Sequence, residues 1–122
     1  MKRLVFMLSV ALSSALCLCM VKQADAYTFT TLNAPGANWT RAHSINDTGG
    51  VAGYYRDSAG WHGFIYDGAS YTTLNVPGAD GTVAYGINDT GNVVGRYVDS
   101  ASGDHGFIYD GASYTTLNVP GA

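Results

Sequence analysis

The sequence predicts an all-β protein built from tandem four-stranded antiparallel meanders that resemble the blades of a β-propeller. Residues 62–79 and 105–122 are identical, and residues 44–58 align with residues 86–100 at a spacing of 42 residues. A period of about 40 to 50 residues is typical of propeller blades and similar β-arrays. All 16 glycines lie in residues 27–122, as expected for short strands joined by tight turns. Tyrosine is too frequent in this part for a disordered chain.

Residues 1–26 have the pattern of a cleavable signal peptide. Lys2 and Arg3 precede an apolar stretch at 5–20, and Ala24-Asp25-Ala26 supplies the small residues that signal peptidase reads. We therefore expect cleavage between Ala26 and Tyr27. The mature protein would be secreted, either extracellular or periplasmic.

Two alternatives to a cleavable signal are weaker. A membrane anchor needs about 20 apolar residues, more than this stretch supplies. A lipoprotein signal needs a small residue before its cysteine, whereas Leu16 and Leu18 precede Cys17 and Cys19. Cleavage would remove both cysteines, so no disulfide is expected in the mature chain.

The mature part is acidic. Residues 27–122 contain eight aspartates, three arginines and no lysine or glutamate, which gives a net charge of −5. An acidic surface repels nucleic acid and anionic lipid. Neither nucleic acid nor, after signal cleavage, a membrane is expected as a partner.

Each repeat is predicted to contain four strands, as the second repeat illustrates. Asp89-Thr90-Gly91 and Asp110-Gly111 are turns between strands. A polar loop spans 100–104, and Pro120 ends the last strand because proline cannot donate to a sheet. The predicted strands are 84–88, 93–99, 105–109 and 113–119.

The repeats are too few to close a ring. We expect a partial unit at 27–37, whose extra strand is Tyr27–Asn33, followed by repeats at 38–79 and 80–122. Propellers have about four to eight blades. The sequence therefore predicts an incomplete ring, completed either by further repeats of a longer protein or by self-association through the extra strand.

Glycines recur at equivalent positions inside the predicted strands. Each such glycine costs about 0.5–1 kcal/mol relative to alanine. We therefore expect close backbone approach between stacked sheets, with neutral drift as the alternative. The glycines concerned are Gly53, Gly63, Gly86, Gly95 and Gly106.

No catalytic, cofactor or metal site is predicted, and we expect no enzyme. His62 and His105 lack the spacing of metal ligands, so a packing role in a strand is favoured. The turns at 46–49 and 88–91 lack the alternating oxygen ligands of a calcium loop. No G-x-S-x-G motif occurs. Paired aspartates for glycosidic chemistry stay open, although most aspartates stand just before turn glycines.

Two tryptophans are the best ligand-binding candidates. Trp39 is expected in the loop before the first strand, and Trp61 in the loop after the second, beside Arg56 and Asp57. Aromatic loops at the rim of a propeller can stack on sugars. Alternatively, each tryptophan covers the edge of its own sheet. Asp104 stands at the place of Trp61 in the second repeat, so a ligand site would not be repeated.

The combined motif resembles the extracellular repeats of the HAF family. It reads I-N-D-x-G-x-V-x-G-x-Y, then H-G-F-I-Y-D, then Y-T-T-L-N-V-P-G-A, with Gly63 and Gly106 in the middle of the family's His-Ala-Phe. The resemblance implies a secreted bacterial protein with a β-propeller-like array. It implies no established activity, so no catalytic residue can be carried over. The motif covers Ile45–Tyr55 with His62–Ala79, and Ile87–Tyr97 with His105–Ala122.

Three functions are therefore considered. The first is a secreted or cell-surface, non-enzymatic repeat protein that offers a β scaffold for interaction. The first alternative is a lectin-like module that binds a glycan. The second alternative is a fragment of a larger secreted hydrolase.

Overall fold

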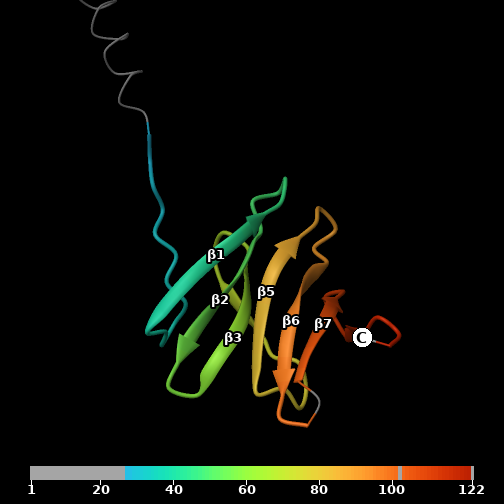
Figure 1. Ribbon diagram of the computed structural model, residues 1–122. Helices are drawn as coiled ribbons and strands as arrows, with labels where there is room; N and C mark the ends of the chain where they lie inside the picture. Colours follow the sequence, from blue (N-terminus) through green and yellow to red (C-terminus); the bar gives the residue numbers. More distant parts are fainter. Residues whose placement is uncertain (1–26, 102, 122) are drawn as a thin grey trace, which may run out of the picture. The chain divides into compact units, whose positions relative to one another are not determined.

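A computed structural model describes residues 27–101 and 103–121 (Figure 1). The predicted signal peptide at 1–26 lies outside the described residues. The chain divides at residue 32, and all the strands lie in residues 32–122. Every element of secondary structure in the described residues is a β-strand, so the all-β prediction is confirmed.

Eight strands form two four-stranded sheets, and in each sheet the strands follow one another in sequence order. Every neighbouring pair is antiparallel, so each sheet is a meander, as predicted. Within residues 27–101 and 103–121 the two sheets form no closed barrel. The first sheet contains β1 (Trp39–Ile45), β2 (Val51–Asp57), β3 (Gly60–Tyr66) and β4 (Tyr71–Leu74). The second contains β5 (Gly81–Ile87), β6 (Val93–Asp99), β7 (Gly103–Tyr109) and β8 (Tyr114–Leu117).

The observed strand bounds differ from the predicted ones mainly at the starts. Strand β6 coincides with its prediction, but β5 begins at Gly81 and β7 begins at Gly103. The β6–β7 hairpin stays paired up to its turn, since Asp99 lies opposite Gly103. The predicted loop at 100–104 is therefore shorter in the structure.

The extra strand predicted at Tyr27–Asn33 is not formed, because residues 27–38 have no strand conformation. Residues 71–74, which are equivalent to residues 29–32 of this segment, pair with β3 of their own sheet. In the described part of the chain, residues 29–32 have no preceding strand of this kind to pair with. Local β-propensity alone does not make a strand without a partner edge.

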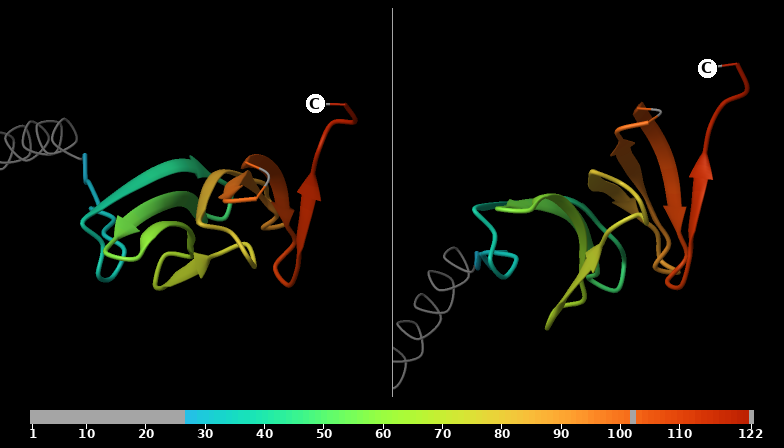
Figure 2. Two further views of the ribbon diagram at one scale, coloured as in Figure 1. Left: turned by 60° about the horizontal axis from the view of Figure 1, so that its bottom comes forward. Right: turned by 90° about the horizontal axis from the view of Figure 1, so that it is seen from below.

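The larger apolar core lies between the two sheets. Strand β5 contacts β1, β2 and β3, and β4 leads directly into the second sheet (Figure 2). Burial of these side chains joins the two repeats into one body. We call this cluster the junction core; its buried members are Ala52, Leu74, Val76, Ala84, Val93 and Phe107.

A second core lies on the other face of the first sheet. Here Ala34 packs against Val51, Tyr55 and Phe64. Residues 32–37 therefore cover the first sheet as residues 74–79 cover the second. The backbone follows the same pattern, because Ala34 N donates to Thr40 Oγ and Val76 N donates to Thr82 Oγ, both at 3.0 Å. Each repeat is thus covered by the tail of the sequence that precedes it.

The glycines inside strands are explained mostly within single sheets. A bulge between Ala42 and Ser44 brings β1 close to β2, and a side chain at Gly53 would collide with Arg41 O and the Phe64 ring. The expected approach between sheets is therefore wrong for Gly53. It is confirmed at Gly63, where a Cβ atom would lie 3.4 Å from Ala84 N of the second sheet.

Candidate functional site

Trp39, Arg56 and Trp61 form one row across the first sheet. Trp39 lies opposite Arg56 in the β1–β2 pair, and Arg56 lies opposite Trp61 in the β2–β3 pair. Residues paired in this way project from the same face. The prediction that both tryptophans lie in loops is wrong, since each is at or near the start of a strand. The β2–β3 turn contains only residues 58 and 59, so pairing extends to Trp61.

The two tryptophans contact each other and Tyr54. Ring centroids are 4.7 Å apart between Trp39 and Trp61, 5.7 Å between Trp39 and Tyr54, and 5.8 Å between Tyr54 and Trp61. The two contacts of Trp39 are edge-to-face, a favoured geometry for aromatic pairs. The guanidinium of Arg41 lies 5.1 Å from the Trp39 ring, and that of Arg56 lies 5.5 Å from the Trp61 ring.

The aromatic cluster continues onto the second sheet. His43 stacks on Tyr54 with centroids 5.0 Å apart and meets Tyr85 of β5 edge-to-face at 5.0 Å. Tyr54 and Tyr85 are 6.1 Å apart. Sequence reasoning missed these three rings, although strand alternation places Tyr54 beside Arg56. We call the whole surface the aromatic face; it consists of Trp39, His43, Tyr54, Trp61 and Tyr85 with Arg41, Arg56 and Arg96.

A small pocket opens in the aromatic face where the two repeats meet. Its volume is about 130 Å³. Pockets for drug-sized ligands are larger, about 300–1,000 Å³, so this one suits a single group of an extended ligand. It is lined by Tyr54, Trp61, Gly81, Val83, Tyr85, Arg96 and Val98.

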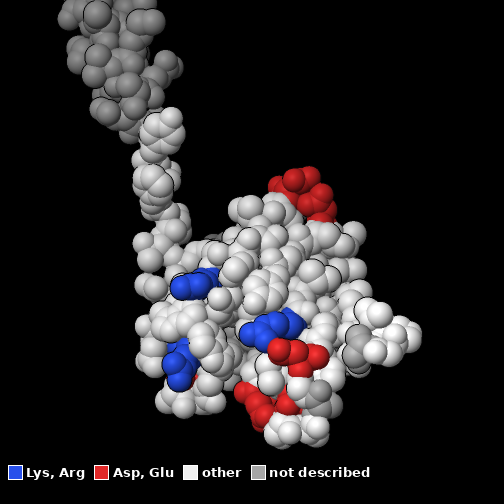
Figure 3. All heavy atoms as spheres, viewed as in Figure 1, with Lys and Arg blue, Asp and Glu red and all other residues white. Residues whose placement is uncertain are grey.

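The positive charge of residues 27–122 is concentrated on the aromatic face, because it holds all three arginines. Figure 3 shows arginine atoms spread over one side of the molecule and acidic atoms mainly towards the ends of the sheets. A hydrogen bond to Tyr85 raises the pKa of Arg96, which also pairs with Asp104 at 2.6 Å. Arg96 is therefore a fixed cation beside the pocket.

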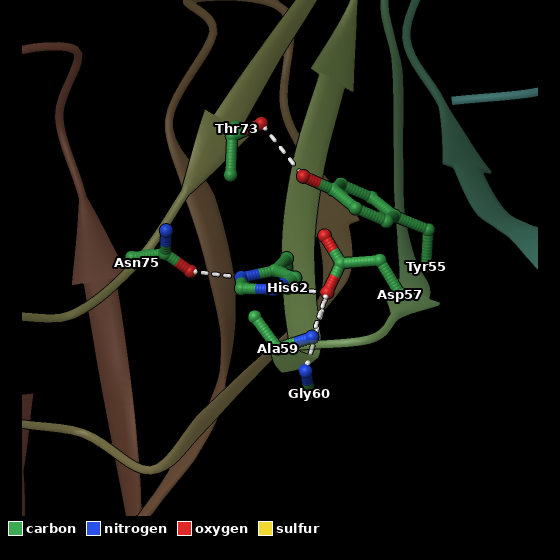
Figure 4. Close-up of polar contacts among 7 residues, drawn as sticks. All are labelled: Tyr55, Asp57, Ala59, Gly60, His62, Thr73 and Asn75. Carbon is green, nitrogen blue, oxygen red and sulfur yellow. Dashed lines mark hydrogen bonds and ion pairs between the residues drawn. The ribbon is translucent and has the colours of Figure 1, made fainter. Parts of the chain in front are cut away.

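Asp57 does not belong to the aromatic face. Its carboxylate accepts hydrogen bonds from Ala59 N at 2.8 Å and Gly60 N at 3.2 Å, and it contacts His62 at 3.1 Å (Figure 4). The bond from Ala59, helped by His62, holds the pKa of Asp57 below its ordinary value. As the neighbour of Arg56 on a strand, Asp57 points to the opposite face. It closes the β2–β3 turn.

His62 links two segments of its repeat. Its Nε2 faces Asp57 and its Nδ1 lies 2.7 Å from Asn75 Oδ1, just beyond β4 (Figure 4). The second repeat has the same arrangement, with His105 between Asp99 at 3.4 Å and Asn118 at 3.0 Å. In both repeats the histidine therefore bridges an aspartate and an asparagine, which fits a packing role.

The Asn-Asp-Thr-Gly turns hold their own backbone and also join the repeats. Asn46 Oδ1 accepts hydrogen bonds from Gly50 N at 2.7 Å and Thr48 Oγ at 3.0 Å. Its Nδ2 donates to Asn88 O at 3.0 Å, and Asp47 N donates to Asp89 Oδ1 at 2.9 Å. Within the described residues, no three His, Cys, Asp or Glu side chains are placed to hold a metal ion.

Comparison with models of protein families, with curated proteins and with solved structures finds no match for this chain. No helix among the described residues is long and apolar enough to cross a membrane. A function must therefore be inferred from the aromatic face, the Asp–His–Asn links and the way in which the repeats join.

Proposed function

We propose that this protein is a non-enzymatic repeat protein, secreted or on the cell surface, whose aromatic face binds carbohydrate. The observation that carries the proposal is the contact of Trp39 with Trp61 at 4.7 Å, beside Tyr54 and three arginines. Exposed apolar patches of this kind mark interaction sites. The β-sheets serve as the scaffold that holds the rings in place.

Carbohydrate suits the chemistry of the aromatic face. A sugar ring presents C–H groups on its two faces and hydroxyl groups around its rim. Aromatic side chains offer the matching apolar surface, and arginine offers several hydrogen-bond donors in a fixed plane. The pocket of about 130 Å³ would take one substituent of a polymer that lies along the face.

The polar groups of the face favour binding over hydrolysis. Glycosidases use two carboxyl groups about 5–9.5 Å apart on either side of the scissile bond. The carboxylate that contacts the aromatic face is Asp104, and Arg96 holds it at 2.6 Å. One arginine-bound carboxylate does not provide such a pair of carboxyl groups.

Secretion and the family assignment are part of the proposal and rest on the sequence. The signal-like residues 1–26 support export, and the HAF-like motif supports a place among extracellular bacterial repeat proteins. An extracellular setting would bring the aromatic face into contact with cell-wall or environmental polysaccharides.

A glycan array tests the proposal. The wild-type protein is expected to bind at least one glycan class, and Trp61→Ala is expected to weaken that binding about tenfold or more, as for a hot-spot aromatic residue. Tyr27→Ala is the control, because Tyr27 is an exposed aromatic residue outside the face. Circular dichroism confirms that the variants are folded. No binding above background, or equal binding by Trp61→Ala, would reject carbohydrate as the ligand.

A further inference from the structure

The two repeats join through a surface whose residues recur at the outer end of the second repeat. In the junction core, Leu74 is 1% exposed and Val76 is 7% exposed. Their counterparts Leu117 and Val119 lie in an identical stretch of sequence but are 47% and 74% exposed. The segment that follows β8 points away from both sheets in Figure 2. The second repeat therefore carries a copy of the joining surface that none of the described residues covers.

The first repeat carries the complementary surface, and its β1 part is exposed among the described residues. Ala84 of β5 is fully buried in the junction core, but its counterpart Ala42 in β1 is exposed. Ile87 packs against the junction core, whereas its counterpart Ile45 is 69% exposed. Strand β1 of the first repeat and the tail of the second thus match each other as β5 and the tail of the first repeat match inside the chain.

The receiving site for the tail is also the same in both repeats. Val76 packs among residues that include Val93 and Phe107. In the first repeat, Val51 and Phe64 hold the corresponding places and are covered by Ala34. Alanine is smaller than valine, so Ala34 fills this site less completely than a valine would.

We propose that a second copy of this chain docks head-to-tail, with Leu117–Gly121 of one copy on the first sheet of the next. The tail of the first copy takes the place of residues 32–37 of the next copy. Strand β1 of that next copy then covers the outer face of the second sheet of the first copy. The contact is heterologous, so it forms an open filament or a closed ring. This inference rests on the repeat junction and is independent of carbohydrate binding.

The hydrogen bonds between the turns of the two repeats can also form between two copies. Asn46 Nδ2 donates to Asn88 O within the chain. In the assembly, Asn88 Nδ2 donates in the same way to Asn46 O of the second copy. Asp89 N likewise donates to the Asp47 carboxylate of that copy. These bonds fix the register of the two copies, since both turns keep the geometry seen between the repeats.

Sedimentation velocity over a series of concentrations tests the docking. The wild-type protein is expected to form dimers and larger species as concentration rises. Val119→Asp blocks the tail end and Ile45→Asp blocks the β1 end, and each alone is expected to weaken association about tenfold or more. Both positions are exposed, so the monomer stays folded. Ala59→Asp in the β2–β3 turn adds the same charge at an exposed position that belongs neither to the tail nor to β1 nor to the receiving site, and it is expected to leave association unchanged.

Mixing the two variants distinguishes head-to-tail docking from other contacts. Val119→Asp retains an intact β1 end and Ile45→Asp retains an intact tail, so the mixture is expected to form dimers and to stop there. A wild-type protein that is monomeric at every concentration would overturn the proposal. So would association that survives both substitutions, or a mixture that does not dimerise.

A further variant tests whether the tail of another copy displaces residues 32–37. In Ala34→Val, residues 32–37 are expected to pack more completely on the first sheet and so to compete better with the incoming tail. Association is expected to weaken several-fold, while thermal unfolding moves to higher temperature. Unchanged association in a more stable Ala34→Val protein would rule out the exchange.

Discussion

The side-chain amide of Asn46 donates to the backbone oxygen of Asn88, the residue that holds the same place in the next repeat. Asp47 and Asp89 are joined in the same way by a backbone-to-carboxylate bond. Each turn therefore closes its own hairpin and also holds the neighbouring turn. Hydrogen bonds between equivalent residues set the register of the repeats, in addition to the apolar junction core.

Two variants can separate the contribution of the Asn46–Asn88 hydrogen bond to stability from that of the hydrogen bonds inside each turn. Asn46→Ala removes both kinds, whereas Asn88→Ala removes only the bonds that Asn88 Oδ1 accepts from Asn92 N and Thr90 Oγ. Asn46→Ala is expected to be more destabilising by about 0.5–1 kcal/mol, the usual net worth of one hydrogen bond. Urea unfolding of the two variants measures the difference. Equal losses would mean that the bond between turns contributes nothing.

Leu74 and Leu117 form a matched pair for the junction core. Leu74→Ala leaves a cavity between the sheets and is expected to cost about 2–5 kcal/mol of unfolding free energy. Leu117→Ala changes the same residue in an identical stretch of sequence but at an exposed position. Its cost in the monomer is expected to stay within about 0.5 kcal/mol. Thermal unfolding at low protein concentration compares them, and similar losses would contradict the observed junction.

Gly53 should not tolerate a side chain. A Cβ atom there would collide with Arg41 O, and it would lie 2.9 Å from the Phe64 ring. Gly53→Ala is expected to destabilise the protein by about 1–3 kcal/mol, as overpacking does. Gly81→Ala is the control, because its Cβ atom would lie 3.4 Å from Trp61 Cβ, an ordinary contact. Denaturant unfolding that ranks the two variants equally would contradict the tight β1–β2 approach.

The two Asp-Gly turns should make stability depend on pH in acid. Backbone N–H groups of residues 70 and 69 lower the pKa of Asp67, and those of residues 113 and 112 lower the pKa of Asp110. A lowered pKa in the folded state adds stability above the ordinary value of 3.8, and this stability is lost as pH falls through the folded-state pKa.

The double variant Asp67→Asn/Asp110→Asn is therefore expected to lose less stability than the wild type between about pH 5 and pH 2. Urea midpoints across this range measure the loss. The variant Asp47→Asn/Asp80→Asn removes two charges outside these turns and so controls for the change in net charge. A double variant with the full acid sensitivity of the wild type would show that the turn bonds are not its source.

Much of the fold is readable from the sequence because the signals are local. Strand alternation and the glycine turns predict the meanders, and β6 is predicted to the residue. The conformation of Tyr27–Asn33 is not local, since an extended segment needs a partner edge to become a strand. The covering of each repeat by the preceding tail also depends on long-range packing, which the repeat pattern alone does not reveal.

The candidate site was predicted only in part. The sequence points to Trp39 and Trp61, but the register that brings them into contact depends on how far the β2–β3 pairing extends. Proximity in sequence groups Asp57 with them, whereas strand alternation sends it to the other face. Tyr85 lies one repeat further along the chain, so only the packing of the two sheets brings it to Tyr54.

Residues 62–79 and 105–122 are identical, and each of the two sheets is covered by the tail of the sequence that precedes it. Recombination between the two identical stretches would add or remove one 43-residue repeat. Every remaining tail would still meet a surface that fits it. The number of repeats is therefore free to change during evolution without any new interface having to arise.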